Sequence, residues 1–342
     1  MQKGKLGKSG LEVSKIGFGS IPINRIDADR AAKVIIRAFE LGIDWIDTAE
    51  GSMDSEAKIG IALQQIKRKN IRIFTKSVKK NPEDLKAAIE QSLERMGIDY
   101  IDVFQFHNPS DPDEWAKMLQ NGCLELLKNL QQEGIVKYIG ASAHKKDMAL
   151  QLIDQPEIEV IQFPFNFVMV DHSIKVLEKA CSKEVGFIAM KPFGGGLLYD
   201  PVACIKFQMK YPHLVTDPGF EKEQEVEQVV EIVEKDEPLT LQDQNRIEKI
   251  SNEMGRWFCR RCGYCQPCPQ GVPISQLLII ESLAKRISAN KVVETFRDVV
   301  KEIENCTKCG KCAKRCPYEL PVPEKMRKGV DIYDKLAASC EA

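Results

Sequence analysis

Residues 71–107 read IRIFTKSVKKNPEDLKAAIEQSLERMGIDYIDVFQFH. A short apolar run at 71–78 is followed by an amphipathic helical pattern at 82–97 and by a second apolar run at 100–107. Short strands that alternate with helical patterns of about 10 to 15 residues are typical of βαβ units, in which consecutive strands are parallel. This stretch therefore predicts a parallel sheet covered by helices.

The same strand-and-helix unit recurs on both sides of this stretch. Strands are predicted at 13–20, 43–50, 71–78, 100–107, 136–144, 160–166, 186–196 and 214–219, each followed by a helical pattern. Most of these runs are continuously apolar, as in strands that are buried on both faces. Eight such units within a chain segment of about 230 residues predict an α/β fold of the closed (β/α)₈ TIM barrel type.

The pattern changes near residue 235. Residues 236–256 predict a linker and a helix, with Pro238 near its start and Gly255 near its end. A chain of 342 residues is long enough for one large domain and one small domain. We therefore expect a barrel at 1–235, a linker helix at 236–256 and a small α-helical domain at 257–342.

Composition excludes some partners. The net charge is −1, with basic and acidic residues interspersed, so no electrostatic field favours nucleic acid or an anionic membrane. The N-terminus lacks the apolar run of a signal peptide, and no apolar stretch is long enough to span a membrane. We expect a cytoplasmic protein, in whose reducing surroundings the twelve cysteines remain thiols or ligate metal.

Eight of the twelve cysteines form two runs within the last third of the chain. The second run, Cys306, Cys309, Cys312 and Cys316 followed by Pro317, has the spacing of bacterial ferredoxins. In such proteins three cysteines of a run hold one [4Fe–4S] cluster and the fourth ligates the other cluster. This pattern predicts one cluster on Cys259, Cys262, Cys265 and Cys316, and a second cluster on Cys306, Cys309, Cys312 and Cys268.

The first run has only two residues between Cys265 and Cys268, one fewer than the ferredoxin pattern, so its fourth ligand is less firmly assigned. Paired C-x₂-C motifs also occur in zinc sites, which is the alternative interpretation. Each run consists of three evenly spaced cysteines and a fourth cysteine that is followed by proline. This arrangement favours iron–sulfur clusters. A helical segment at 275–305 separates the two runs.

Polar residues stand at the ends of nearly all the predicted barrel strands, where TIM barrels carry their chemistry. They are Asp47, Lys76, His107, Ser142, Gln162 with Asn166, Lys191, and the turn Asp217-Pro218-Gly219. Each alone is compatible with a loop cap or a solvated charge, but together they predict an active site at this end of the barrel.

The stretches WIDTAEGSMDSEAKIG, IRIFTKSVKK, DVFQFHNP and YIGASAH resemble the aldo-keto reductase family. MKPFGGG and CGYCQPCPQGVPI narrow the resemblance to its bacterial branch with a C-terminal ferredoxin-like domain. The resemblance implies NAD(P)H as cofactor and a catalytic tetrad of Asp, Tyr, Lys and His. Asp47, Lys76 and His107 match three members of the tetrad.

Ser52 stands where the family has its catalytic tyrosine. A serine hydroxyl is a far poorer acid than a phenol, and loss of a positioned acid costs about 10²- to 10⁴-fold in rate. Either His107 or Lys76 supplies the proton, or the reaction is not carbonyl reduction, or the tyrosine has been replaced deliberately. Glu50, on the same loop, is a weaker candidate for this role.

The resemblance also implies where NAD(P)H binds. Ser142 and Gln162 match the residues that hold the nicotinamide carboxamide, and Gly219 matches the turn that contacts the pyrophosphate. Lys191 either faces the cofactor or pairs with a carboxylate. Glu221 lies near the position where NADP-dependent relatives have a basic or hydroxyl residue, which slightly favours NADH.

These patterns predict an NAD(P)H-dependent oxidoreductase with two [4Fe–4S] clusters, acting on a small-molecule substrate. The alternatives are an electron-transfer protein whose barrel is catalytically degenerate, and clusters that only stabilise a small domain. Hydride carries two electrons and each cluster moves one, so the two paths need an intermediary. A flavin and a ferredoxin are candidate electron partners, although the sequence has no flavin signature.

Overall fold

The computed structural model describes residues 1–341 except 52, 256 and 317. The chain divides into two compact units. The first consists of Met1–Pro192 and Asp200–Leu239, and the second consists of Phe193–Tyr199 and the chain from Thr240 onward. The domain borders expected at residues 235 and 256 stay predictions.

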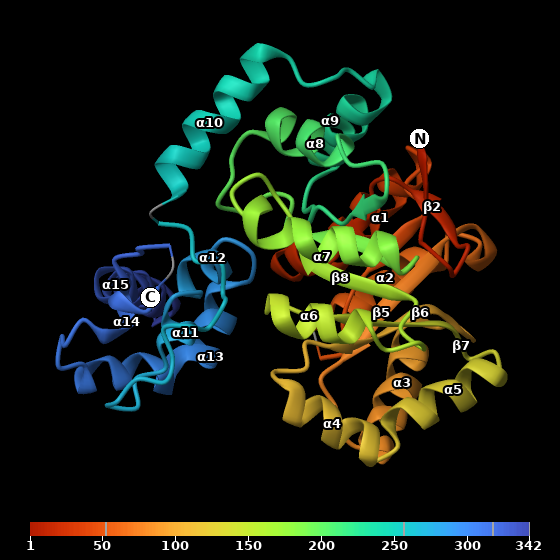
Figure 1. Ribbon diagram of the computed structural model, residues 1–342. Helices are drawn as coiled ribbons and strands as arrows, with labels where there is room; N and C mark the ends of the chain where they lie inside the picture. Colours follow the sequence, from red (N-terminus) through yellow and green to blue (C-terminus); the bar gives the residue numbers. More distant parts are fainter. Residues whose placement is uncertain (52, 256, 317, 342) are drawn as a thin grey trace. The chain divides into compact units, whose positions relative to one another are not determined.

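The first unit is built on a sheet of eight parallel strands (Figure 1). In chain order they are β3 (Phe18–Gly19), β4 (Trp45–Asp47), β5 (Arg72–Ser77), β6 (Ile101–His107), β7 (Val136–Ser142), β8 (Val160–Pro164), β9 (Gly186–Met190) and β10 (Leu214–Thr216). Each strand pairs with the next one along the chain. Parallel bridges from Ile16 to Thr216 and from Gly19 to Gly219 join the first strand to the last. The sheet therefore closes, which confirms the predicted barrel.

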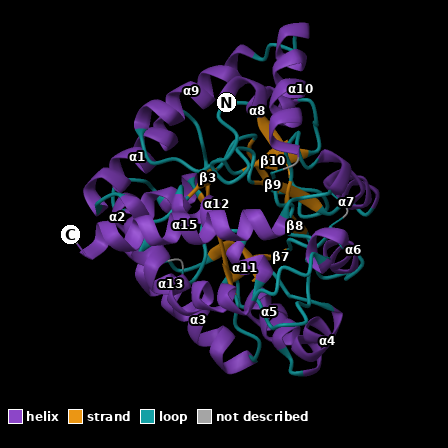
Figure 2. Cartoon of the chain, turned by 90° about the vertical axis from the view of Figure 1, so that its left-hand side faces the viewer, coloured by secondary structure: helices purple, strands orange, loops and turns teal. Residues whose placement is uncertain are grey.

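Helices lie around this sheet, as Figure 2 shows for the strands in orange and the helices in purple. They are α1 (Ala28–Glu40), α2 (Ser55–Leu63), α3 (Pro82–Met96), α4 (Pro112–Gln120), α5 (Cys123–Gln132), α6 (Lys146–Ile153), α7 (Val170–Ser182), α8 (Pro201–Met209) and α9 (Glu223–Lys235). Short 3₁₀ helices occupy Ile21–Arg25 and Arg68–Asn70.

Helix α3 shows how the local sequence sets these boundaries. The Asn81 side chain accepts a hydrogen bond from the backbone N–H of Asp84, and Pro82 occupies the first turn. Gly97 ends the helix in the left-handed conformation at φ 63°, which glycine adopts without steric cost. Leu85, Ala88, Ile89, Ser92 and Met96 form its buried face. The signals for the start of the helix, Asn81 and Pro82, and for its end, Gly97, can be read directly from the sequence.

An antiparallel hairpin of β1 (Lys3–Lys5) and β2 (Glu12–Ser14) precedes the barrel and was not predicted. Leu6 and Val13 are fully buried. They belong to one hydrophobic cluster with strand residues Trp45, Phe74, Val103, Val160, Ile188 and Val215. Several of these lie at or near the N-terminal ends of their strands, so the hairpin packs at the end of the barrel opposite Asp47.

The second unit is helical. Its elements are α10 (Leu241–Gly255), α11 (Ile274–Leu277), α12 (Ile280–Ala284), α13 (Ala289–Lys301), a 3₁₀ turn (Glu302–Asn305), α14 (Lys311–Lys314) and α15 (Val322–Glu341). Its core combines aliphatic side chains such as Leu277 and Val292 with the cysteines Cys265 and Cys312. None of the described helices is both long enough and apolar enough to cross a bilayer.

Candidate functional site

A buried ion pair lies at the C-terminal end of the barrel strands. Lys76 Nζ is 2.6 Å from Asp47 Oδ2, and each residue is only 8% exposed. Lys76 also donates to the backbone carbonyl of Thr48 at 2.8 Å. Adjacent parallel strands, β4 and β5, hold the two residues, so the sheet itself fixes their approach. The lysine ammonium is thereby oriented at the barrel mouth.

Two residues of β6 extend this group. His107 ends the strand and is half-buried. Gln105, two residues earlier on the same strand face, places Nε2 3.4 Å from Asp47 Oδ1. Gln105 was not singled out from the sequence, although its two-residue spacing from His107 was the available signal. Strands β4, β5 and β6 therefore contribute adjacent polar groups.

The loop after β4 holds the other candidates for the proton donor. Ser52, at the tyrosine position, lies outside the described residues. Glu50 donates its backbone N–H to the carbonyl of Lys76 at 2.8 Å. Its carboxylate accepts a hydrogen bond from Ser77 Oγ at 3.1 Å. Glu50 is thus tied to β5 beside the lysine rather than extended into solvent.

Asp217 is a further ionisable group at the barrel mouth, directly after β10. Its Oδ2 accepts a hydrogen bond from Gln162 Nε2 at 2.7 Å. Burial raises the pKa of Asp217 well above its usual range; the nearby charge of Asp47 adds to this effect and Lys76 opposes it. The sequence marked the turn that contains Asp217 but gave the carboxyl no role. Its proximity to the Asp47–Lys76 pair depends on barrel closure.

The residues expected to bind nicotinamide lie on neighbouring strands. Ser142 and Gln162 are directly paired between β7 and β8, and both are buried. Ser142 Oγ accepts from the backbone N–H of Asn108 at 3.2 Å. Among the described residues, Gln162 Oε1 and Asp217 Oδ1 have no hydrogen-bond partner. Both oxygens are acceptors, so the NH₂ group of a carboxamide, which carries two donors, fits them.

Lys191 and Gly219 stand in turns after β9 and β10. Lys191 has a positive φ of 60°, and its carbonyl accepts a hydrogen bond from Asn166 Nδ2 at 3.0 Å. A Cβ added to Gly219 would lie 2.7 Å from the Pro22 ring. Only glycine therefore fits in this turn before α9. Glu221, which follows, is 3.4 Å from the Arg25 guanidinium.

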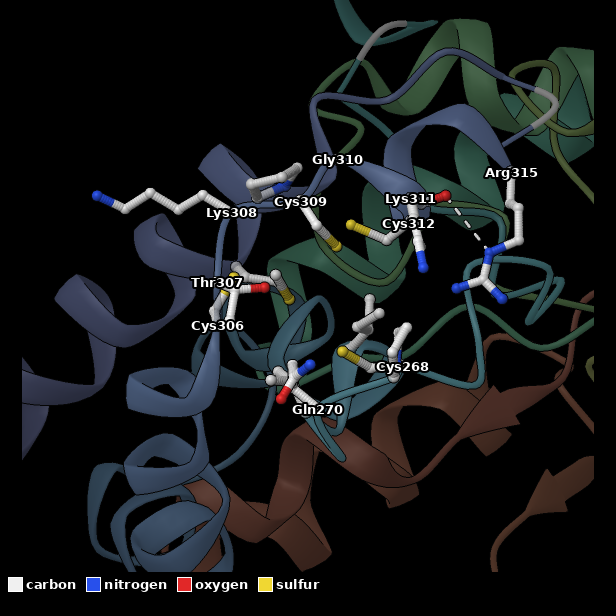
Figure 3. Close-up of a pocket in the computed structure, with 15 residues that line it drawn as sticks. Cys268, Gln270, Cys306, Thr307, Lys308, Cys309, Gly310, Lys311, Cys312 and Arg315 are labelled. Atoms are coloured by element: carbon white, nitrogen blue, oxygen red, sulfur yellow. Dashed lines mark hydrogen bonds between the residues drawn. The ribbon is translucent and has the colours of Figure 1, made fainter.

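In the second unit the eight clustered cysteines line two cavities. One is lined by Cys259, Cys262, Cys265 and Cys316, together with Arg260, Arg261, Tyr318 and apolar residues. The other is lined by Cys268, Cys306, Cys309 and Cys312 and is drawn in Figure 3. Each cavity thus takes three cysteines from one run and one from the other. Within the described chain, no three His, Cys, Asp or Glu side chains are close enough to share a single metal ion.

The thiols of the two cavities differ in their surroundings. Burial raises the pKa of Cys265 to about 11 and also raises that of Cys259. At the exposed Cys309 a backbone N–H of Lys311 lowers the pKa. Thiolates are the forms that bind iron, so occupation of these cavities by a cluster has to displace the protons.

Comparison with known proteins finds two matching families. Residues 15–202 match the aldo/keto reductase family, and residues 258–321 match a 4Fe-4S dicluster domain. A probable aldo-keto reductase of Glycine max is 29% identical over 216 residues, which are 57% of this chain and 60% of that protein. The NADH-specific methylglyoxal reductase of Escherichia coli is 27% identical over 197 residues, 49% of this chain and 60% of that protein. The chain thus spans less than two thirds of the length of either relative.

A solved aldo-keto reductase from Bacillus halodurans, in its holo form, has a similar fold. The TM-score is 0.63 at 23% identity, and the likeness covers 73% of this chain and 96% of that one.

Proposed function

We propose, because this chain belongs to the aldo/keto reductase family, that its barrel transfers hydride between a nicotinamide dinucleotide and a small carbonyl or alcohol substrate. The observation that carries the proposal is the buried Asp47–Lys76 pair at 2.6 Å, at the strand ends where TIM barrels hold their catalytic groups. The second part of the proposal is that the eight cysteines hold two [4Fe–4S] clusters.

Lys76 is the central group of the proposed site. The Asp47 carboxylate keeps the Lys76 side chain oriented, and the carbonyl of Thr48 accepts a hydrogen bond from the Lys76 ammonium. An ammonium in this position stabilises negative charge that develops on a substrate oxygen. With serine at position 52, we assign the proton delivered to that oxygen to Lys76 or to His107.

Nicotinamide, when bound, supplies the hydride. We assign its carboxamide to Ser142 and Gln162, because Gln162 Oε1 is buried without a described partner and lies on the strand next to Ser142. Lys191 is assigned to the same cofactor, and Gly219 to the pyrophosphate at the turn before α9. Glu221 adds negative charge near this turn, so we propose NADH rather than NADPH as the preferred dinucleotide.

The clusters are assigned by cavity. Cys259, Cys262, Cys265 and Cys316 surround one space, and Cys268, Cys306, Cys309 and Cys312 surround the other. The four cysteine ligands of a cubane cluster lie around the whole cluster and do not converge on a single ion. Cysteines that line a cavity therefore fit this group. We propose that both clusters carry electrons, with a flavin or a redox protein as intermediary.

The test uses the anaerobic holoprotein with either dinucleotide. Binding is followed by nucleotide fluorescence, carbonyl reduction by nucleotide oxidation, and the clusters by their visible absorbance. We expect the wild-type protein to bind the dinucleotide and to turn over a carbonyl substrate. We expect Lys76→Met to abolish the turnover. Bleaching without added flavin connects the hydride path to the clusters. Nucleotide binding without turnover on any carbonyl or alcohol overturns the reductase proposal and favours an electron-transfer protein with a degenerate barrel.

A further inference from the structure

Four basic side chains line the cavity of Cys268, Cys306, Cys309 and Cys312 or the open hollow beside it. They are Lys308, Lys311, Lys314 and Arg315, which we call the basic collar. All four are exposed. Lys308, Lys311 and Arg315 line the thiol cavity itself, and Lys311, Lys314 and Arg315 line an open hollow beside it. Positive charge is therefore concentrated around one of the two proposed clusters.

No acidic residue interrupts the collar. The sequence from Cys306 to Tyr318 contains four basic residues and no aspartate or glutamate. Among the described residues, no carboxylate forms an ion pair with Lys308, Lys311, Lys314 or Arg315. Arg315 is held instead by the backbone carbonyls of Cys265 and Pro267, at 2.9 and 2.8 Å. The nearest acids in sequence are Glu304, four residues before Lys308, and Glu319, four residues after Arg315, and both are exposed.

The thiols inside the collar are accessible. Cys309 is exposed, and Cys268 and Cys306 are partly buried. Figure 3 shows the sulfur atoms of Cys309 and Cys312 on the cavity side, whereas Lys308 extends away from the cavity. Electron transfer falls steeply with distance, so a carrier must approach a cluster closely. A cluster bound here is open to such an approach, and within the described part of the chain no carboxylate forms an ion pair with the cations around it.

The other cavity differs in its charges. Its basic residues, Arg260 and Arg261, are both partly buried. The Arg260 guanidinium lies 3.9 Å from the centre of the Tyr318 ring. These cations are engaged within the protein rather than presented to solvent. The two cavities therefore divide into one with an exposed cationic rim and one without.

We propose that the basic collar is the docking surface for an acidic one-electron carrier protein, which exchanges electrons with the cluster held by Cys268, Cys306, Cys309 and Cys312. The inference rests on the proposed clusters. In the reducing direction the carrier is oxidised by one electron and the cluster is reduced by one, with no bond made or broken. Complementary charge raises the rate of encounter, while the small contact typical of redox partners allows rapid release.

The experiment uses the anaerobic holoprotein with oxidised clusters and an acidic flavodoxin, fully reduced, as the probe. Stopped-flow absorbance follows loss of one electron from the flavin. The test variant is Lys308→Glu/Lys311→Glu/Lys314→Glu. At low ionic strength we expect its second-order rate to be about 10- to 1,000-fold below that of the wild type. Added salt should reduce the difference, because exposed charges are screened.

The matched control carries the same charge change elsewhere in the second unit: Lys249→Glu/Arg297→Glu/Lys335→Glu, on α10, α13 and α15. All three positions are exposed. We expect wild-type rates from this control. At high salt, where the negative charge of dithionite is screened, we expect equal rates from all three proteins with this small reductant. Equal flavodoxin rates for the collar variant and the wild type at low salt overturn the proposal, as does an equal loss in the control. Because dinucleotide turnover is not measured, failure of the reductase proposal gives a separate result.

Discussion

Lys76 and Asp47 illustrate how one side chain depends on another. Both are nearly buried, so each charge is stable mainly because the other is present. Lys76→Met leaves a buried carboxylate without its cation, and we expect the free energy of unfolding to fall by about 3–5 kcal/mol. Urea denaturation measures this. The double variant Asp47→Asn/Lys76→Met should recover much of the loss, and a double variant no more stable than the single one would contradict this explanation.

Asp217 gives a pH-dependent prediction. Its pKa is raised in the folded protein by burial and by Asp47. The unfolded chain therefore loses this proton at lower pH than the folded one, and stability falls as pH rises toward the raised pKa. Asp217→Asn removes that cost. We expect the variant to gain stability relative to the wild type as pH increases from about 4, near the ordinary carboxyl pKa, in urea titrations across pH. A difference that does not change with pH would be inconsistent with this account.

Ser52 gives a prediction about rate. If the chemistry is carbonyl reduction, Ser52→Tyr restores the phenol that the aldo-keto reductase family has at this position, and a phenol is a far better acid than a serine hydroxyl. A positioned general acid contributes about 10²- to 10⁴-fold, so we expect the carbonyl reduction rate to rise within this range. Ser52→Phe is the matched control, because it adds the ring without the hydroxyl. An equal change in both variants would assign the effect to shape rather than to acid catalysis.

Between elements, the β1–β2 hairpin has a role separate from the strand ends that carry Asp47 and Lys76. Leu6 is fully buried among residues such as Trp45 and Val215, at the opposite end of the strands. Leu6→Ala should cost about 2–5 kcal/mol of unfolding free energy. Dinucleotide affinity in native conditions should be unchanged, while the exposed control Lys5→Ala should alter neither quantity. A weakened affinity in the folded Leu6→Ala protein would show that the two ends are coupled.

In the molecule as a whole, the two cysteine runs are interdependent. Cys265 and Cys312 also belong to the hydrophobic core of the second unit, so cluster binding is expected to contribute to its folding. We predict that Cys316→Ser/Cys262→Ser loses half of the iron, because both residues line one cavity. Cys316→Ser/Cys309→Ser should lose nearly all of it. Iron and sulfide analysis of the purified proteins distinguishes these results, and the reverse order would assign each run to its own cluster.

Much of the architecture is local information and could be predicted. Apolar runs alternating with amphipathic helices specify βαβ units. Asn81, Pro82 and Gly97 mark the two ends of one of these helices directly. Asp47, Lys76 and His107 were found because each stands at the end of its own strand. The β1–β2 hairpin was missed because each strand has only three residues, in a largely polar stretch. Such strands are too short to show a recognisable alternation of apolar and polar residues.

Distances between remote residues were decided only by the tertiary structure. The approach of Gln105 to Asp47 and of Gln162 to Asp217 joins positions more than 50 residues apart in the chain. The register of the strands sets these contacts, and no local pattern in the sequence specifies that register. The same holds for charge: the sequence contains the four cations of the basic collar, but their exposure and their lack of a described acidic partner depend on how the second unit packs. Hydrophobic periodicity depends on residues that are close in the chain, so it can be read from the sequence. Desolvation and Coulomb interactions depend on residues that are close in space, so they require the tertiary structure.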